Sequence, residues 1–218
     1  MKRYGSIIRL RPEYEERYVI LHRHVFPQVL KTIHLCNIRN YSIFLREGVL
    51  FATFEYHGTS LPKDMKRMAA DGVTQEWWKL TTPMQEPFAS REKGEWWASL
   101  EQVITLGARA ARPRLRSAAV AEVGEGNAER IRELIVREAA QLFPAFSRVK
   151  GRSLSLFLKD HQLYLYTEYT GAHPERAEQR LMKSQPWKSW EENLRPFVRT
   201  EDGYGSPWSL MREVFYTP

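Results

Sequence analysis

The amino-acid sequence predicts an α+β protein built from two similar halves. An internal repeat is the first sign: residues 43–45 (Ile-Phe-Leu) return as 156–158 (Leu-Phe-Leu), and 54–58 return as 167–171, each 113 residues later. The second sign is the order of elements, which in each half is strand, helix, two strands, helix and strand. The third is the length of 218 residues, which accommodates two domains of about 100 residues. So long a period indicates a duplicated domain.

Turn and helix signals place the elements of the first half. Pro12 opens a helix whose first turn carries Glu13 and Glu15, and Pro27 should kink or end that helix. The turn at residues 46–48 joins two apolar strands into a hairpin. The predicted strands are 4–10, 41–45, 49–56 and 100–106, and the predicted helices are 12–26, 62–70 and 73–81.

The second half repeats this order. Asn127 is a suitable N-cap for its first helix. The predicted strands are 116–123, 153–158, 162–169 and 209–216, and the predicted helices are 127–143, 174–182 and 186–194. Each half therefore has the split βαβ, ferredoxin-like order, with helices on one face of an antiparallel sheet. Because the other face must also be covered, we expect the two halves to pair inside the chain. The expected domains are 1–106 and 116–218, with a linker at 107–115.

Composition and charge exclude several classes of protein. The 33 basic and 26 acidic side chains give a net charge of +7, but the excess is spread over both halves, so we expect no nucleic-acid partner. The densest basic run, residues 109–116, is typical of a solvated linker. No stretch is long and apolar enough for a bilayer, and the N-terminus has no secretory signal, so we expect a cytoplasmic protein without a membrane partner. Cys36 is the only cysteine, which excludes a disulfide framework.

Two groups of side chains are candidates for chemistry. Tyr18 and His22 are four residues apart on a predicted helix and share one face. Trp77 and Trp78 are adjacent on another helix, so their side chains point about 100° apart, and one can enter a core while the other lines a pocket. On this evidence alone, ordinary core packing is the better explanation of both groups. The sequence contains no zinc-protease motif, nucleophile elbow or glycine-rich phosphate loop.

The first half resembles the L-rhamnose mutarotase family. The resemblance rests on residues 16–22 (ERYVILH), 26–27 (FP), 40–45 (NYSIFL) and 75–78 (QEWW), and the chain end 213–218 (EVFYTP) is similar to the family's last strand. It implies a dimeric α+β barrel, formed here by the two halves of one chain. It also implies an enzyme that interconverts the α and β anomers of a deoxy sugar without cofactor or metal.

The resemblance also assigns the site residues. It makes His22 the catalytic acid/base residue and Tyr18, Tyr41, Trp77 and Trp78 the substrate-binding residues. The chemistry of the residues agrees, because ring opening takes a proton from the anomeric hydroxyl and gives one to the ring oxygen. Histidine, with a pKa near neutrality, is suited to both transfers.

The second half has lost these polar groups. The positions that match Tyr18, His22, Tyr41, Trp77 and Trp78 are occupied, in that order, by Ile135, Ala139, Leu154, Trp190 and Glu191. We therefore expect the second half to be a degenerate copy that acts as a structural partner.

Several functions are compatible with the sequence. The leading hypothesis is a carbohydrate mutarotase acting on L-rhamnose or a related neutral sugar, with a monosaccharide as its partner. The alternative is a non-catalytic sugar- or small-ligand-binding barrel. A cofactor-free monooxygenase or isomerase acting on an aromatic substrate is a third hypothesis, and it rests only on the abundance of aromatic residues.

Overall fold

The computed structural model describes residues 2–107, 111–200 and 205–218, and the chain divides into two compact units. Unit 1 consists of Met1–Leu100 and Arg212–Pro218, and unit 2 of Glu101–Met211. The sequence placed the domains at 1–106 and 116–218. The unit boundaries of the structure differ, because the strand that follows Leu100 pairs within unit 2 and the end of the last strand, from Arg212 on, pairs within unit 1. Residues 108–110 of the expected linker lie outside the described residues.

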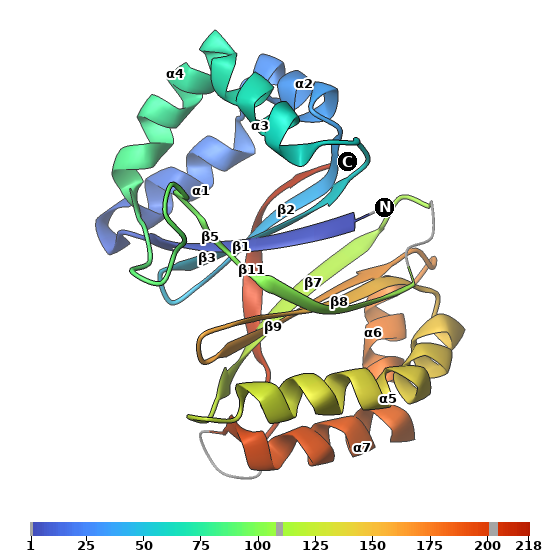
Figure 1. Cartoon of the computed structure of the whole chain (residues 1–218). Coiled ribbons are helices and arrows are strands. Elements are labelled where there is room, and N and C mark those ends of the chain that lie inside the picture. The colour runs from blue at the N-terminus through green and yellow to red at the C-terminus, as the bar shows by residue number, and fades with distance from the viewer. Residues whose placement is uncertain (1, 108–110, 201–204) are drawn as a thin grey trace. The chain divides into compact units, whose positions relative to one another are not determined.

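Unit 1 is an antiparallel sheet with four helices on one face (Figure 1). The strand order is β4-β1-β3-β2-β11, and β5 also pairs with β1. The order of the first four strands is that of the ferredoxin-like fold, as the sequence predicts. The elements are β1 (Lys2–Leu10), α1 (Glu15–Arg23), α2 (Pro27–Leu35), β2 (Ile38–Arg46), β3 (Val49–Tyr56), α3 (Leu61–Ala70), α4 (Gly72–Thr81), β4 (Gln85–Glu86), β5 (Ala98–Ser99) and the end of β11 (Ser209–Thr217).

Prolines divide the first helical segment of unit 1 differently from the prediction. Residues Pro12–Tyr14 form a 3₁₀ turn, and α1 begins only at Glu15. The helix ends at Arg23, and Pro27 then occupies the first turn of a second helix, α2, which the sequence analysis did not predict. The residue before a proline avoids the helical conformation, and Phe26 is indeed extended, with ψ 128°. The break leaves α1 as a short helix packed on the sheet.

Unit 2 repeats these elements on its own sheet, again with the helices on one face (Figure 1). The strand order is β7-β9-β8-β6, and both β10 and the start of β11 pair with β7. The elements are β6 (Glu101–Gly107), β7 (Leu115–Val123), α5 (Ala128–Arg148), β8 (Gly151–Lys159), β9 (Gln162–Tyr169), α6 (Pro174–Met182), α7 (Gln185–Leu194), β10 (Val198–Arg199) and the start of β11.

The 113-residue offset seen in the sequence recurs in the strand register. In unit 1, Tyr4 of β1 lies opposite Phe54 of β3, and in unit 2 Ser117 of β7 lies opposite Thr167 of β9. Helices α4 and α7 begin at Gly72 and Gln185, which are also 113 residues apart. Positions of the two units can therefore be compared one by one.

The first helix of unit 2 also differs from the prediction. The sequence analysis ended it at Phe143, but α5 continues through Pro144 to Arg148. Buried side chains lie on both sides of the proline, namely Leu142 before it and Phe146 after it. Their packing against the sheet outweighs the lost backbone hydrogen bond, whereas the matching Pro27 of unit 1 begins a new helix.

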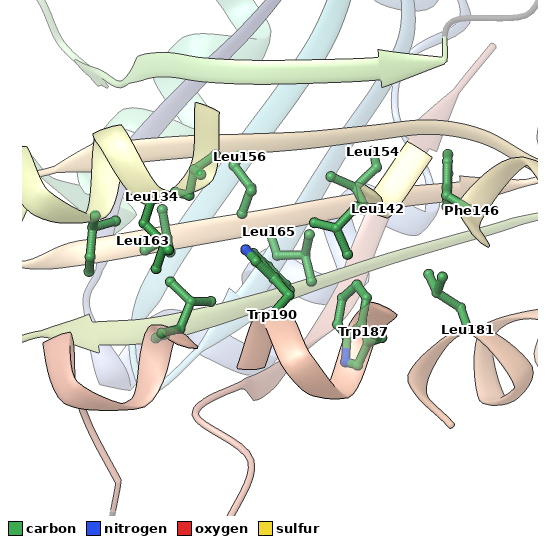
Figure 2. Close-up of a cluster of buried hydrophobic side chains, with 14 of the residues drawn as sticks. Leu134, Leu142, Phe146, Leu154, Leu156, Leu163, Leu165, Leu181, Trp187 and Trp190 are labelled. Atoms are coloured by element: carbon green, nitrogen blue, oxygen red, sulfur yellow. The ribbon is translucent and has the colours of Figure 1, made fainter. Parts of the chain in front are cut away.

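The core of unit 2 is aliphatic with an aromatic wall (Figure 2). Leu134 and Leu142 of α5, Leu154 of β8, and Trp187 and Trp190 of α7 all belong to this cluster. The core of unit 1 instead mixes apolar residues with Tyr18. No helix within the described part of the chain has the length and apolar character needed to cross a membrane.

Candidate active site

The predicted Tyr18–His22 pair lies on the buried face of α1. Both side chains are turned toward the sheet, and they are the only buried residues of this helix. Their rings stack with centroids 3.9 Å apart, as the spacing of four residues allows. His22 keeps only 8% of its surface exposed, while the nearby His24 is exposed.

The hydrogen bond of His22 fixes its tautomer. Nδ1 lies 2.9 Å from the backbone oxygen of Tyr18, and because a carbonyl oxygen can only accept, Nδ1 carries the proton. The lone pair of Nε2 then has no hydrogen-bond partner among the described residues. Burial lowers the pKa of His22 to about 4, a shift that the Tyr18 carbonyl only partly opposes. His22 is therefore neutral at pH 7 and rests as a base. This corrects the expectation of a near-neutral pKa that suits both proton transfers.

Aromatic side chains from distant elements surround the His22 ring. Trp77 of α4 meets it edge-on at 5.2 Å between centroids, and Phe215 of β11 does so at 5.8 Å. Phe26, just before α2, packs edge-on against Trp77 at 5.3 Å. These contacts hold the imidazole in an apolar surrounding, which is the cause of its low pKa.

Tyr41 reaches the same group from the sheet. The register of β2 against β3 shifts between Arg39 and Ser42, and Asn40 in this bulge has a positive φ of 46°. A bulge of this kind redirects the side chains beside it. The Tyr41 ring meets Phe215 at 5.5 Å, and burial raises the pKa of its hydroxyl to about 12. Tyr41 is thus a neutral hydroxyl at physiological pH.

Gln85 and Trp96 extend the site beyond the residues that the sequence analysis selected. Burial raises the pKa of Tyr18 well above its usual value, with a further contribution from Tyr41, and a hydrogen bond from the Gln85 side chain opposes the rise. The indole N–H of Trp96 donates to Gln85 Oε1 at 2.8 Å, which leaves the Gln85 amide N–H for Tyr18. The sequence carries no signal for this contact, because β4 consists of the two polar residues Gln85 and Glu86 and only the structure shows that Gln85 is buried.

Trp78 is the one predicted site residue that stands apart. It is 39% exposed and lies beside Gln75, Lys79 and Pro83 on the outer surface of α4. Its neighbour Trp77 is buried against His22, as expected for adjacent helical residues. The structure therefore brings together Tyr18, His22, Tyr41 and Trp77, and does not add Trp78 to them.

The described residues contain no cluster of metal ligands near Tyr18, His22, Tyr41 and Trp77. Among residues 2–107, 111–200 and 205–218, no three histidine, cysteine or carboxylate side chains lie close enough together to hold a metal ion. Cys36 is buried and unpaired with another cysteine.

Unit 2 has an apolar core at the matching positions. Ile135 and Leu154 are fully buried there, and Trp190 of α7 packs against Trp187 at 4.9 Å between ring centroids. The aliphatic side chains supply neither an acid nor a base.

Comparison with known families finds a match over the first half of the chain. The sequence profile of the family described as L-rhamnose mutarotase matches residues 3–106. L-rhamnose mutarotases of Bacillus subtilis and Listeria monocytogenes are 32% and 31% identical to this chain over 88 residues. That match covers 39% of this chain and 82% of each relative, so it concerns the first half of the sequence.

Solved structures with a similar fold cover almost the whole chain. A candidate monooxygenase of Fusobacterium nucleatum is 11% identical with a TM-score of 0.61, covering 98% of this chain and 92% of that one. A candidate monooxygenase of Lactobacillus acidophilus is 10% identical with a TM-score of 0.59, covering 99% and 96%. At this identity the likeness concerns the fold alone, and it agrees with the predicted ferredoxin-like α+β class.

Proposed function

The chain belongs, through its first half, to the L-rhamnose mutarotase family, and we propose that unit 1 is a mutarotase that interconverts the anomers of L-rhamnose or a related neutral sugar. The observation that carries the proposal is the state of His22. Nε2 of the neutral imidazole has an unpartnered lone pair, which is an available acceptor for the proton of a sugar hydroxyl.

The proposed reaction begins with ring opening. Nε2 of His22 accepts the proton of the anomeric hydroxyl while the bond between the anomeric carbon and the ring oxygen breaks. A neutral tyrosine hydroxyl, from Tyr18 or Tyr41, donates a proton to the ring oxygen. The product is the open-chain aldehyde.

Ring closure reverses these transfers. Rotation about the bond next to the aldehyde presents its other face to the same hydroxyl. The hydroxyl attacks the carbonyl carbon, returns its proton to the tyrosine, and the new anomeric oxygen recovers the proton from His22. No electrons or atoms are gained or lost, so the reaction needs neither an oxidant nor a cofactor. Positioned acid/base groups contribute about 10²–10⁴-fold to such a rate.

The surroundings of His22 support a neutral substrate with an apolar face. Tyr18, Tyr41 and His22 are uncharged at pH 7, and Trp77 and Phe215 contribute only aromatic surface. A charged sugar would find no counter-charge among these five side chains. The methyl group of a 6-deoxy sugar suits an aromatic wall. Trp78 is proposed as a more distant contact of the sugar, from the outer surface of α4.

The roles of the two halves are also part of this proposal. We propose that unit 2 is a degenerate copy that pairs with unit 1 as a structural partner, and that the protein works in the cytoplasm. The loss of the histidine and both tyrosines at the matching positions supports a single catalytic site.

Proton NMR magnetisation exchange between the two anomers tests the activity directly. We expect the wild-type protein to accelerate exchange for L-rhamnose more than for fucose, galactose and glucose. Absence of acceleration for all four sugars would overturn the proposal. Quenching of tryptophan fluorescence by a sugar, without exchange, would then identify a binding module.

A further inference from the structure

Unit 2 contains a cavity between its sheet and its last two helices. It has a volume of about 300 Å³ and is bounded by β7, β9, α6, α7 and the segment 206–210. In unit 1 the rings of Tyr4 and Phe54 stack here, 5.5 Å apart. The matching residues of unit 2, Ser117 and Thr167, have small side chains and both line the cavity. The two small side chains leave room that the two rings occupy in unit 1.

The walls of the cavity are aromatic. Tyr169, Trp187 and Trp208 line it, and Trp208 stacks on the buried Trp190 at 5.6 Å. The indole N–H groups of Trp187 and Trp208 are buried, and neither has a hydrogen-bond partner among the described residues. Buried donors of this kind are costly unless an acceptor meets them, and because an ammonium group has no acceptor, a water molecule must supply it. The cavity therefore differs from an empty apolar cavity, which has no polar groups in its wall.

Two carboxylates face the same space without a counter-ion. Glu178 of α6 and Glu191 of α7 line the cavity, and in the described part of the chain neither forms an ion pair. Their partners are hydroxyl groups: Glu178 bonds to Ser117, and Glu191 Oε1 accepts from Ser206 Oγ at 3.0 Å. None of the lining residues is a lysine, arginine or histidine, although the chain carries a net charge of +7.

We propose that this cavity binds a small organic cation, an ammonium group carried on an apolar or aromatic body. Aromatic faces attract cations, and tryptophan does so most strongly. Two carboxylates in the same wall supply the counter-charge that a desolvated ammonium requires. Burial raises the pKa of Glu178, an effect opposed by its bond to Ser117 and increased by Glu175. A bound cation would relieve this cost, and a bound anion would increase it.

Three probes that differ in charge but share a phenyl body test the proposal: 2-phenylethylammonium, 2-phenylethanol and phenylacetate. Their affinities for the full-length protein are measured by titration calorimetry at pH 7 and low salt. We expect the cation to bind at least about tenfold more tightly than the alcohol, and the anion not to bind. Equal affinity of the cation and the alcohol would overturn the proposal, as would failure of the cation to bind at millimolar concentration.

Variants assign the binding to this cavity. Glu178→Gln and Glu191→Gln should each weaken the cation about tenfold and leave the alcohol unchanged. Glu192→Gln is the matched control, because Glu192 is the exposed neighbour of Glu191 on α7 and does not line the cavity. Ser117→Tyr, which restores the ring present at Tyr4 of unit 1, should abolish binding of every probe. Unchanged cation affinity in all three cavity variants would contradict the assignment. Since the site lies within unit 2, this test is independent of sugar exchange in unit 1.

Discussion

The two units carry different side chains at matching sequence positions. Unit 1 has Tyr18, His22 and Tyr41, and unit 2 has Ile135, Ala139 and Leu154. The backbone elements correspond at an offset of 117 residues in the first helix and 113 residues in the strands and in the last helix, yet the side chains at matching positions differ. Unit 1 holds a base whose pKa is about 4 among neutral hydroxyls. Unit 2 holds an aliphatic core beside an aromatic cavity. A shared fold thus fixes the positions of side chains, and substitution at a few of them determines the chemistry.

The largest effect is expected from a matched pair of tryptophan variants. Trp77→Ala and Trp190→Ala each remove a buried indole at the same position of the repeat, and each should lower the free energy of unfolding by about 3–5 kcal/mol. Only Trp77→Ala should also slow anomer exchange, by about ten- to a hundredfold, because Trp77 contacts His22. Urea denaturation and NMR exchange per folded molecule measure the two effects. Equal slowing by Trp190→Ala would remove the distinction between the units.

Acid should destabilise the protein through His22. The pKa falls from its usual 6.5 to about 4 on folding, so the unfolded chain binds the proton more readily. The contribution of neutral His22 to the free energy of unfolding is fully present above about pH 6.5. It is lost as the pH falls toward 4, and the loss is at most about 3 kcal/mol.

Denaturation midpoints between pH 4 and 7 measure this loss. His22→Gln should flatten the dependence relative to wild type, while His24→Gln, which changes an exposed histidine, should keep it. A variant His22→Gln with the full wild-type slope would assign the acid sensitivity to another group.

A smaller effect is expected at the bulge that directs Tyr41. Asn40 donates to Glu55 Oε2 at 2.9 Å and accepts from the Tyr216 hydroxyl at 3.0 Å. Asn40→Ala removes both bonds and puts alanine, which tolerates the left-handed region less well than asparagine, at a positive φ, so it should cost about 2–3 kcal/mol. Asn40→Gly tolerates the positive φ and should recover about 1 kcal/mol of that loss. Thermal denaturation of both variants checks this order, and a stability of Asn40→Gly below that of Asn40→Ala would contradict it.

The smallest effect is expected at Trp96. Trp96→Phe removes the N–H that donates to Gln85 but keeps an aromatic ring at a position that is 43% exposed. It should change the free energy of unfolding by less than about 1 kcal/mol and slow exchange by less than about tenfold. A hundredfold loss of exchange would instead place Trp96 among the residues that contact the sugar.

Local patterns predicted most of the elements and the shared face of two candidate site residues, Tyr18 and His22. The spacing of Tyr18 and His22 placed them on one buried face, because helical geometry depends only on neighbouring residues. The hairpin strands followed from apolar runs around a turn whose central residues, Glu47 and Gly48, both have positive φ.

Contacts between distant segments were not predictable in this way. The sequence does not indicate that β11 joins β2, so the contact of Phe215 with His22 was missed. Gln85 was missed for the same reason, since its partners Tyr18 and Trp96 come from separate elements. The end of α5 was predicted wrongly at Phe143, because a proline such as Pro144 usually ends a helix. The packing of α5 keeps the helix intact through Pro144.

Magnetisation exchange between L-rhamnose anomers in His22→Ala and His24→Ala tests the central claim most directly. The two histidines lie two residues apart, but only His22 is buried with an unpartnered Nε2. We predict that His22→Ala lowers the enzymatic exchange rate by about 10²–10⁴-fold, while His24→Ala retains the wild-type rate. Wild-type exchange in a folded His22→Ala protein would contradict the account.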